Sequence, residues 1–154
     1  MSPILFTGPT GTPAASNSRI HSADARVFRR SAINGVLSTA ATLKVSSRVV
    51  VIGDPEGLTE DPVDCLLASQ ASMATCTTTW PSSALAPYDS VARGARALDV
   101  GFLPTRGFLC FDRRCPTVIG NTIAWMDTDH MTVAYSVQIA GAFRAAFLDA
   151  TRRR

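Results

Sequence analysis

The sequence lacks any run of about 18 consecutive apolar residues, so it predicts no transmembrane helix. Charge is also scarce: Asp, Glu, Lys and Arg make up 18% of the 154 residues, whereas apolar residues make up 46%. A chain with this balance can bury a core, which argues against disorder as its main state. The length is that of one domain of common size. We therefore expect one folded domain.

Clustered positive charge and aromatic residues are limited as well. The formal net charge is +3, and the excess is local, at Arg29–Arg30 and Arg152–Arg154. A nucleic-acid-binding surface usually combines a basic cluster with interleaved aromatic residues, and aromatic residues are only 7% of this chain. We interpret residues 151–154 as a solvated basic tail, and nucleic acid is not a predicted partner.

The N-terminal region shows no apolar periodicity. Residues 1–25 are rich in Pro, Gly, Ser, Thr and Ala, which predicts a disordered lead. Met1–Pro13 has neither the basic segment nor the sustained apolar segment of a signal peptide. From these residues alone no export is predicted, and the chain expressed as given would be cytoplasmic.

Residues 26–150 carry the patterns of a folded α/β domain. The strongest strand signal is Arg48–Gly53, where four consecutive β-branched residues lie between turn formers. Such a strand is typically covered on both faces, as in a parallel sheet. A helical pattern begins before it at Arg26, and a helix at 86–98 and a short strand at 100–103 follow it. Helices that alternate with buried strands predict a layered α/β fold.

The last helical pattern runs over 132–149. Thr132 is a residue type that caps helix N-termini. Apolar residues recur along this segment at helical spacing, which predicts a buried stripe. The predicted stripe consists of Val133, Val137, Ala140, Phe143 and Phe147.

The four cysteines fall into two near-neighbour pairs, Cys65 with Cys76 and Cys110 with Cys115. Four cysteines allow three disulfide connectivities, and the sequential one closes two short loops. A zinc site is an alternative, but the spacings are not of the Cys-x-x-Cys type and no histidine lies near either pair. Reduced thiols are a second alternative. Disulfides would indicate an oxidising compartment.

Only two histidines are present, His21 and His130. His130 follows Asp127 by three residues and is adjacent to Asp129. A carboxylate at the three-residue offset on a loop can reach the imidazole Nδ1, which fixes the tautomer and leaves Nε2 free to act as a base. The alternative interpretation is that these acidic residues stabilise the N-terminus of the following helix.

The segment from Pro116 to Tyr135 resembles the end of the SGNH domain that is fused to many bacterial acyltransferase family 3 membrane proteins. In that family a Cys-Pro precedes an apolar strand ending in Gly-Asn, and an Asp-x-x-His block and a final helix follow. Val49–Pro55 also looks like the strand and Asp-x-Pro loop of these domains. The two cysteine pairs also look like the family's pairs. Together these features extend the resemblance over about residues 27–150.

This resemblance implies a fold, a chemistry and a setting. The fold would be a three-layer α/β/α arrangement with a mostly parallel, flavodoxin-like sheet. Asp127 would orient His130, and His130 would act as general base and then general acid in acyl-ester hydrolysis or O-acyl transfer on cell-surface glycans. The domain would lie outside the cytoplasm, with a membrane acyltransferase as partner and with no metal or organic cofactor.

The sequence also departs from the family pattern. No Gly-Asp-Ser nucleophile block occurs, because Gly53-Asp54 is followed by Pro55. We therefore expect the N-terminal part of the domain to be missing and the chain to be a truncated portion. Asn121 could shape the site or simply form a turn. The alternative is a non-catalytic SGNH-fold protein. Its candidate glycan contacts, which could equally be packing residues, are Trp80, Tyr88 and Trp125.

Overall fold

The computed structural model describes residues 17–152, with the backbone alone for 17–26 and 29. The chain divides into two compact units, residues 1–32 and 33–154. Helix α1 (Asn17–Leu43) begins before the expected start at Arg26. No Gly or Pro interrupts the chain between Pro13 and Gly35, so nothing in that stretch opposes an earlier start. Residues 17–25 of the expected disordered lead are thus helical, and residues 1–16 lie outside the described part.

The other elements belong to the second unit. They are β1 (Val50–Ile52), α2 (Pro62–Leu67), β2 (Thr77–Thr79), the 3₁₀ helix η1 (Ser82–Leu85), α3 (Ala86–Ala97), β3 (Gly101–Leu103), α4 (Arg106–Leu109), β4 (Arg114–Pro116), β5 (Val118–Ile119), β6 (Thr122–Ile123) and α5 (Val133–Arg152). The two strands and the helix predicted between residues 48 and 103 are confirmed as β1, β3 and α3, with somewhat shorter bounds.

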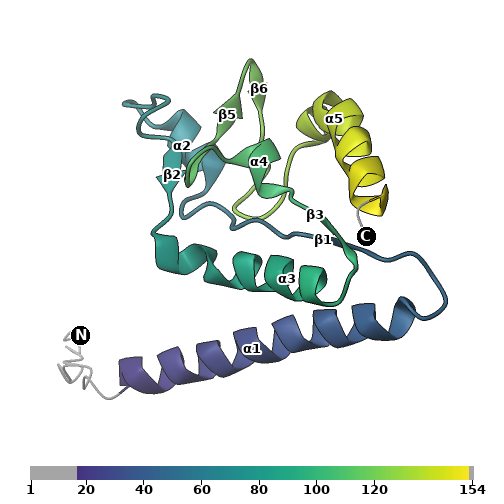
Figure 1. Ribbon diagram of the computed structural model, residues 1–154. Coiled ribbons are helices and arrows are strands. Elements are labelled where there is room, and N and C mark those ends of the chain that lie inside the picture. The colour runs from purple at the N-terminus through teal and green to yellow at the C-terminus, as the bar shows by residue number, and fades with distance from the viewer. Residues whose placement is uncertain (1–16, 153–154) are drawn as a thin grey trace, which may run out of the picture. The chain divides into compact units, whose positions relative to one another are not determined.

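The centre of this unit is the parallel pair of β1 and β3, in which Val51 lies opposite Phe102. Val51 faces a core cluster that includes Ala95 of α3 and Ala40 near the end of α1. Gly101 faces α5, where an added Cβ would lie 2.4 Å from the carbonyl oxygen of Ala150. Helices therefore cover both faces of the parallel pair, with α3 on one side and α5 on the other (Figure 1). The fold is α/β.

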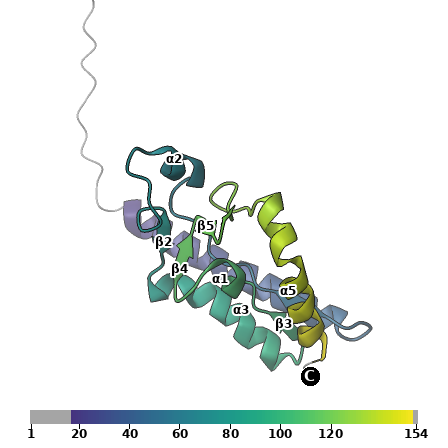
Figure 2. The same cartoon turned by 90° about the horizontal axis from the view of Figure 1, so that it is seen from above.

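The parallel sheet has only two strands within residues 17–152. The remaining strands form two antiparallel pairs, β2 with β4 and β5 with β6. Both pairs lie on the same side of the unit as α2 (Figures 1 and 2). Strand β2 occupies a stretch that lacks an alternating pattern. It forms by pairing with β4, which lies far along the chain. The expected mostly parallel, three-layer arrangement is therefore not confirmed: among residues 17–152 the parallel part is one pair of strands with helices on both faces.

Both short-range disulfides are formed, Cys65–Cys76 and Cys110–Cys115. The second closes a tight hairpin in which Phe111 and Arg114 exchange backbone hydrogen bonds of 2.8 and 2.9 Å. The two residues of its turn have left-handed backbones, as a type I′ turn requires. This local geometry brings the two sulfur atoms together, and the sequential pairing is confirmed.

Helix α5 has the predicted cap but a different buried face. The Thr132 hydroxyl accepts a hydrogen bond from the Tyr135 amide at 3.1 Å. Of the predicted stripe, Val133 and Val137 are 79% and 71% exposed. The inward face instead carries Tyr135, whose hydroxyl donates to the Phe108 carbonyl. The contacts of Phe108 on α4 with Tyr135 and Phe143 thus set the rotation of the helix. The predicted stripe was wrong except at Phe143.

Helix α5 runs to Arg152, so residues 151–152 of the expected basic tail are helical. Residues 153–154 lie outside the described part. Between residues 17 and 152, no helix combines the length and the apolar character needed to cross a membrane.

Candidate functional site

Asp127 and His130 lie in the loop between β6 and α5, and their side chains are in contact. The Asp127 Oδ2 and Oδ1 atoms lie 2.8 and 3.0 Å from the His130 Nδ1. The His130 side chain is 70% exposed and that of Asp127 is 43% exposed. The imidazole is therefore held at Nδ1 while most of the ring remains open to solvent. The catalytic role of the pair remains a prediction.

The loop folds around the Asp127 carboxylate. Its Oδ1 accepts the backbone N–H groups of Asp129 at 2.8 Å and of His130 at 2.7 Å. The Asp129 amide, followed by the His130 side chain and the His130 amide, lowers the pKa of Asp127 below its usual value. The Asp129 carboxylate instead accepts a hydrogen bond from the Thr128 hydroxyl. Asp127 is thus the carboxylate that holds the imidazole.

Helix capping does not explain this arrangement. Helix α5 begins at Val133, and its capping oxygen is supplied by the Thr132 hydroxyl. The Asp127 carboxylate closes its own turn and contacts the imidazole, so its two acceptor atoms serve the loop and not the helix. The simplest alternative to a functional pair is therefore a purely structural turn with an exposed histidine.

A second loop lies directly against the first. The Leu58 amide donates a 2.6 Å hydrogen bond to the Thr128 carbonyl, and an added Cβ on Gly57 would lie 2.2 Å from the same oxygen. Only a glycine permits this approach. The Gly57 carbonyl accepts a 2.9 Å hydrogen bond from the Trp80 indole. The segment that leaves β1, residues 53–58, thus supports the Asp127–His130 turn from one side.

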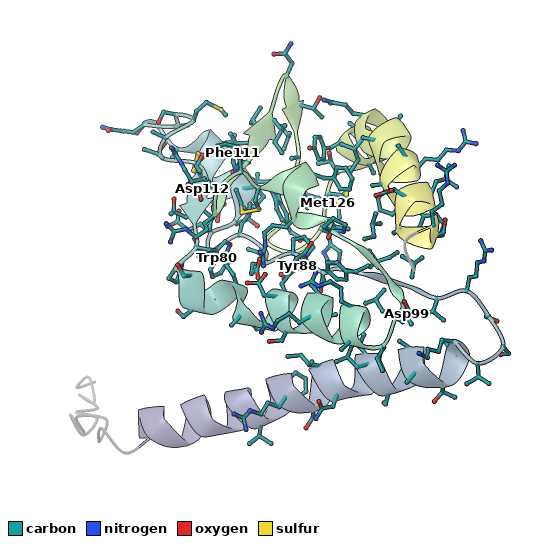
Figure 3. All side chains as sticks on the ribbon, in the orientation of Figure 1. Trp80, Tyr88, Asp99, Phe111, Asp112 and Met126 are labelled. Atoms are coloured by element: carbon teal, nitrogen blue, oxygen red, sulfur yellow. A yellow bond between two sulfur atoms is a disulfide. The ribbon has the colours of Figure 1, made fainter. Side chains whose placement is uncertain are left out.

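The same segment is tied to α3 and α4 by Arg106. Its guanidinium makes two hydrogen bonds to Glu56, at 3.0 and 3.1 Å, and one of 3.2 Å to Asp89. It also stacks over the Tyr88 ring at 3.9 Å; Tyr88 lies on the side of α3 nearest the sheet (Figure 3). Burial alone would lower the pKa of Arg106. The hydrogen bonds and charges of Glu56, and then of Asp89, outweigh burial, so the pKa is raised. Sequence reasoning missed this cluster because Glu56 precedes Arg106 by 50 residues and Asp89 precedes it by 17.

A cavity of about 220 Å³ lies where β1 and β3 end. Its walls include Gly53 after β1, Thr105 after β3, and both Asp129 and Met131, which flank His130 in the sequence. The other lining residues are Ile52, Asp54, Pro55, Phe108, Leu109, Trp125, Ile139 and Phe143. In α/β folds, ligands bind outside the carboxyl ends of parallel strands. The loop that carries His130 therefore borders the part of the fold where a ligand is expected.

The remaining candidate residues occupy structural positions. Asn121 lies in the β5–β6 turn next to Gly120, whose φ is +63°. Trp125 and Tyr88 are only 2% and 8% exposed, so neither can stack on a sugar. Trp80 is half-buried and bonded to the segment after β1. Trp125 and Tyr88 are thus packing residues, whereas a glycan contact of Trp80 and a site-shaping role of Asn121 remain predictions.

Comparison with known proteins identifies the family. The model of the SGNH domain that is fused to AT3 domains matches residues 5–145. The chain belongs to this family. No curated protein and no solved structure matches it. The SGNH domain is of the acyl-ester hydrolase or acyltransferase type, and its fusion to AT3 domains gives a membrane acyltransferase context.

Proposed function

We propose that this SGNH domain supplies the Asp127–His130 acid–base pair of an acyl-ester hydrolase or O-acyltransferase. The observation that carries the proposal is the 2.8 Å contact between the His130 Nδ1 and the Asp127 carboxylate, in a chain that belongs to the SGNH family. When Nδ1–H donates a hydrogen bond to the carboxylate, the Nε2 lone pair stays free at the open side of the ring.

The pair would work as follows. Nε2 of His130 takes the proton of a serine hydroxyl while the serine oxygen attacks the ester carbonyl. The imidazolium, stabilised by Asp127, then gives that proton to the leaving alkoxide, and an acyl-serine forms. Water or a sugar hydroxyl next attacks the acyl group, again losing its proton to Nε2. The serine is released when the proton passes to its oxygen.

The serine itself is proposed to lie outside these 154 residues, since the sequence contains no Gly-Asp-Ser. An open position beside β1 supports this idea. The Val49 carbonyl and the Gly53 amide form hydrogen bonds with β3. The backbone groups of Val50 and Ile52 therefore point to the opposite edge of β1, which has no strand partner within residues 17–152. We propose that a serine-bearing strand from the rest of the SGNH domain joins this edge and extends the parallel sheet into the three-layer fold.

We further propose an extracytoplasmic setting with cell-surface glycans as acyl acceptors or donors and a membrane acyltransferase as partner. The two disulfides support an oxidising compartment. The exposed imidazole supports a large substrate, because a glycan can approach the ring without entering a closed pocket.

The test is hydrolysis of p-nitrophenyl acetate, an activated ester that a lone imidazole attacks slowly. We expect a slow rate that falls clearly in His130→Ala and falls in part in Asp127→Asn. His21→Ala, the same change at the only other histidine, is the matched control for attack by an unassisted imidazole and should lower the rate less. A fluorophosphonate probe should label no serine. Equal rates in the wild type and His130→Ala would contradict the proposal and favour a non-catalytic SGNH-fold protein.

A further inference from the structure

The charged cluster around Arg106 is connected to the site loop by an unbroken series of contacts. We propose that Glu56 and Arg106 are positioning residues that set the orientation of the Asp127–His130 pair. The meaning of this role for catalysis rests on the proposed function, but the mechanical connection can be tested without any turnover.

The connection begins at a fixed guanidinium. The Arg106 and Glu56 side chains are only 19% and 13% exposed, and they make two parallel hydrogen bonds. A bidentate pair of this kind fixes direction as well as distance. The guanidinium is held on its other sides by the Tyr88 ring and the Leu85 carbonyl. Glu56 therefore has little freedom to move relative to α3 and α4.

The connection continues through the backbone. Glu56 precedes Gly57, whose Cα lies so close to the Thr128 carbonyl that no side chain fits between them. The next amide, that of Leu58, donates its 2.6 Å hydrogen bond to the same carbonyl. Thr128 is the residue that follows Asp127. A shift of Glu56 would thus pass directly to the turn that presents the imidazole.

Asp89 offers a matched control because it contacts the same guanidinium from a different element. It lies on α3, bonds Arg106 at 3.2 Å, and is 48% exposed. Its loss removes one carboxylate from Arg106 without touching residues 53–58. An effect transmitted through that segment should therefore follow Glu56 and not Asp89.

The experiment compares Glu56→Gln with Asp89→Asn by NMR of the full chain. We expect Glu56→Gln to speed hydrogen exchange of the Leu58 amide by about fivefold, the factor corresponding to a hydrogen bond of ~1 kcal/mol. We also expect it to reduce the fraction of His130 in the Nδ1–H tautomer, measured from the ring ¹⁵N shifts. Asp89→Asn should change neither, and exchange of the Gly101 amide, bonded to Val49 in the sheet, should stay constant in both.

Two outcomes would overturn the proposal. One is an unchanged His130 tautomer and Leu58 exchange in folded Glu56→Gln; the other is an equal change in both variants, which would indicate general loosening around Arg106. If Glu56→Gln does not fold, Arg106→Lys, which keeps the charge but loses the fork, is read by the same criteria. If the His130 tautomer responds as expected but the chain hydrolyses no ester, the result counts against the proposed function and not against the positioning role.

Discussion

The contact between Gly57 and the site loop gives the sharpest prediction, for the change Gly57→Ala. An added Cβ would lie 2.2 Å from the Thr128 carbonyl oxygen and 2.6 Å from the Asp129 Oδ1. The φ of Gly57 is not in the left-handed region, so alanine carries no backbone strain there. The whole cost is steric, and one of the two obstacles is backbone that cannot rotate away.

The magnitude follows from these distances. Carbon and oxygen atoms approach to about 3.3 Å, so the two loops must separate by roughly 1 Å. A separation of that size would stretch the 2.6 Å bond between the Leu58 amide and the Thr128 carbonyl beyond hydrogen-bond range. Loss of the bond costs about 1 kcal/mol, and forcing a methyl group into a packed contact costs about 1–3 kcal/mol. We expect a total loss of about 2–4 kcal/mol.

The assay is urea unfolding followed by circular dichroism. The matched control is Gly141→Ala in α5, where an added Cβ meets nothing within 4 Å. Because alanine favours a helix over glycine, the control should stabilise the chain by about 0.5–1 kcal/mol. The same methyl group is thus expected to act with opposite signs at the two positions. A Gly57→Ala protein as stable as the wild type would refute the close approach of the two loops.

Three further predictions concern the disulfides, the site carboxylate and the last helix. Replacing Cys65 and Cys76 by serine should cost about 3 kcal/mol, since the disulfide joins residues 11 apart; unchanged stability after replacement would show that the bond is absent in the native protein. Asp127 has a lowered pKa, so its stabilising effect should be present above pH 3.8 and be lost as the pH falls through the lower folded-state value; a carboxyl-carbon titration with its midpoint at or above 3.8 would contradict this. Thr132→Ala should cost about 1 kcal/mol in urea unfolding because the Tyr135 amide loses its cap, whereas Thr132→Ser should cost little, and equal losses would argue against the cap.

The parts of the fold that depend on neighbouring residues could be predicted from the sequence. Four β-branched residues in a row identified β1, and close spacing identified both disulfides. The three-residue offset of Asp127 and His130 identified the contact of their side chains, because a short loop can close on itself. In each case the partners are close along the chain, so spacing alone limits the geometry.

The parts that depend on distant residues could not be predicted in this way. Strand β2 needs β4 as its partner, and the rotation of α5 is set by Phe108 on α4. The pattern on α5 is apolar around most of the helix, so periodicity did not single out one face. The supporting role of Gly57 likewise depends on a loop some seventy residues later. Its only sequence signal is a glycine in the turn-rich segment after β1.

The measurement that bears most directly on the proposed site is the tautomer of His130 in the intact chain, read from the ¹⁵N shifts of its ring at a pH where the ring is neutral. The proton is expected on Nδ1, facing Asp127, with Nε2 unprotonated, and Asp127→Asn should abolish this preference. A neutral ring that carries its proton on Nε2 would contradict a base directed toward a serine hydroxyl.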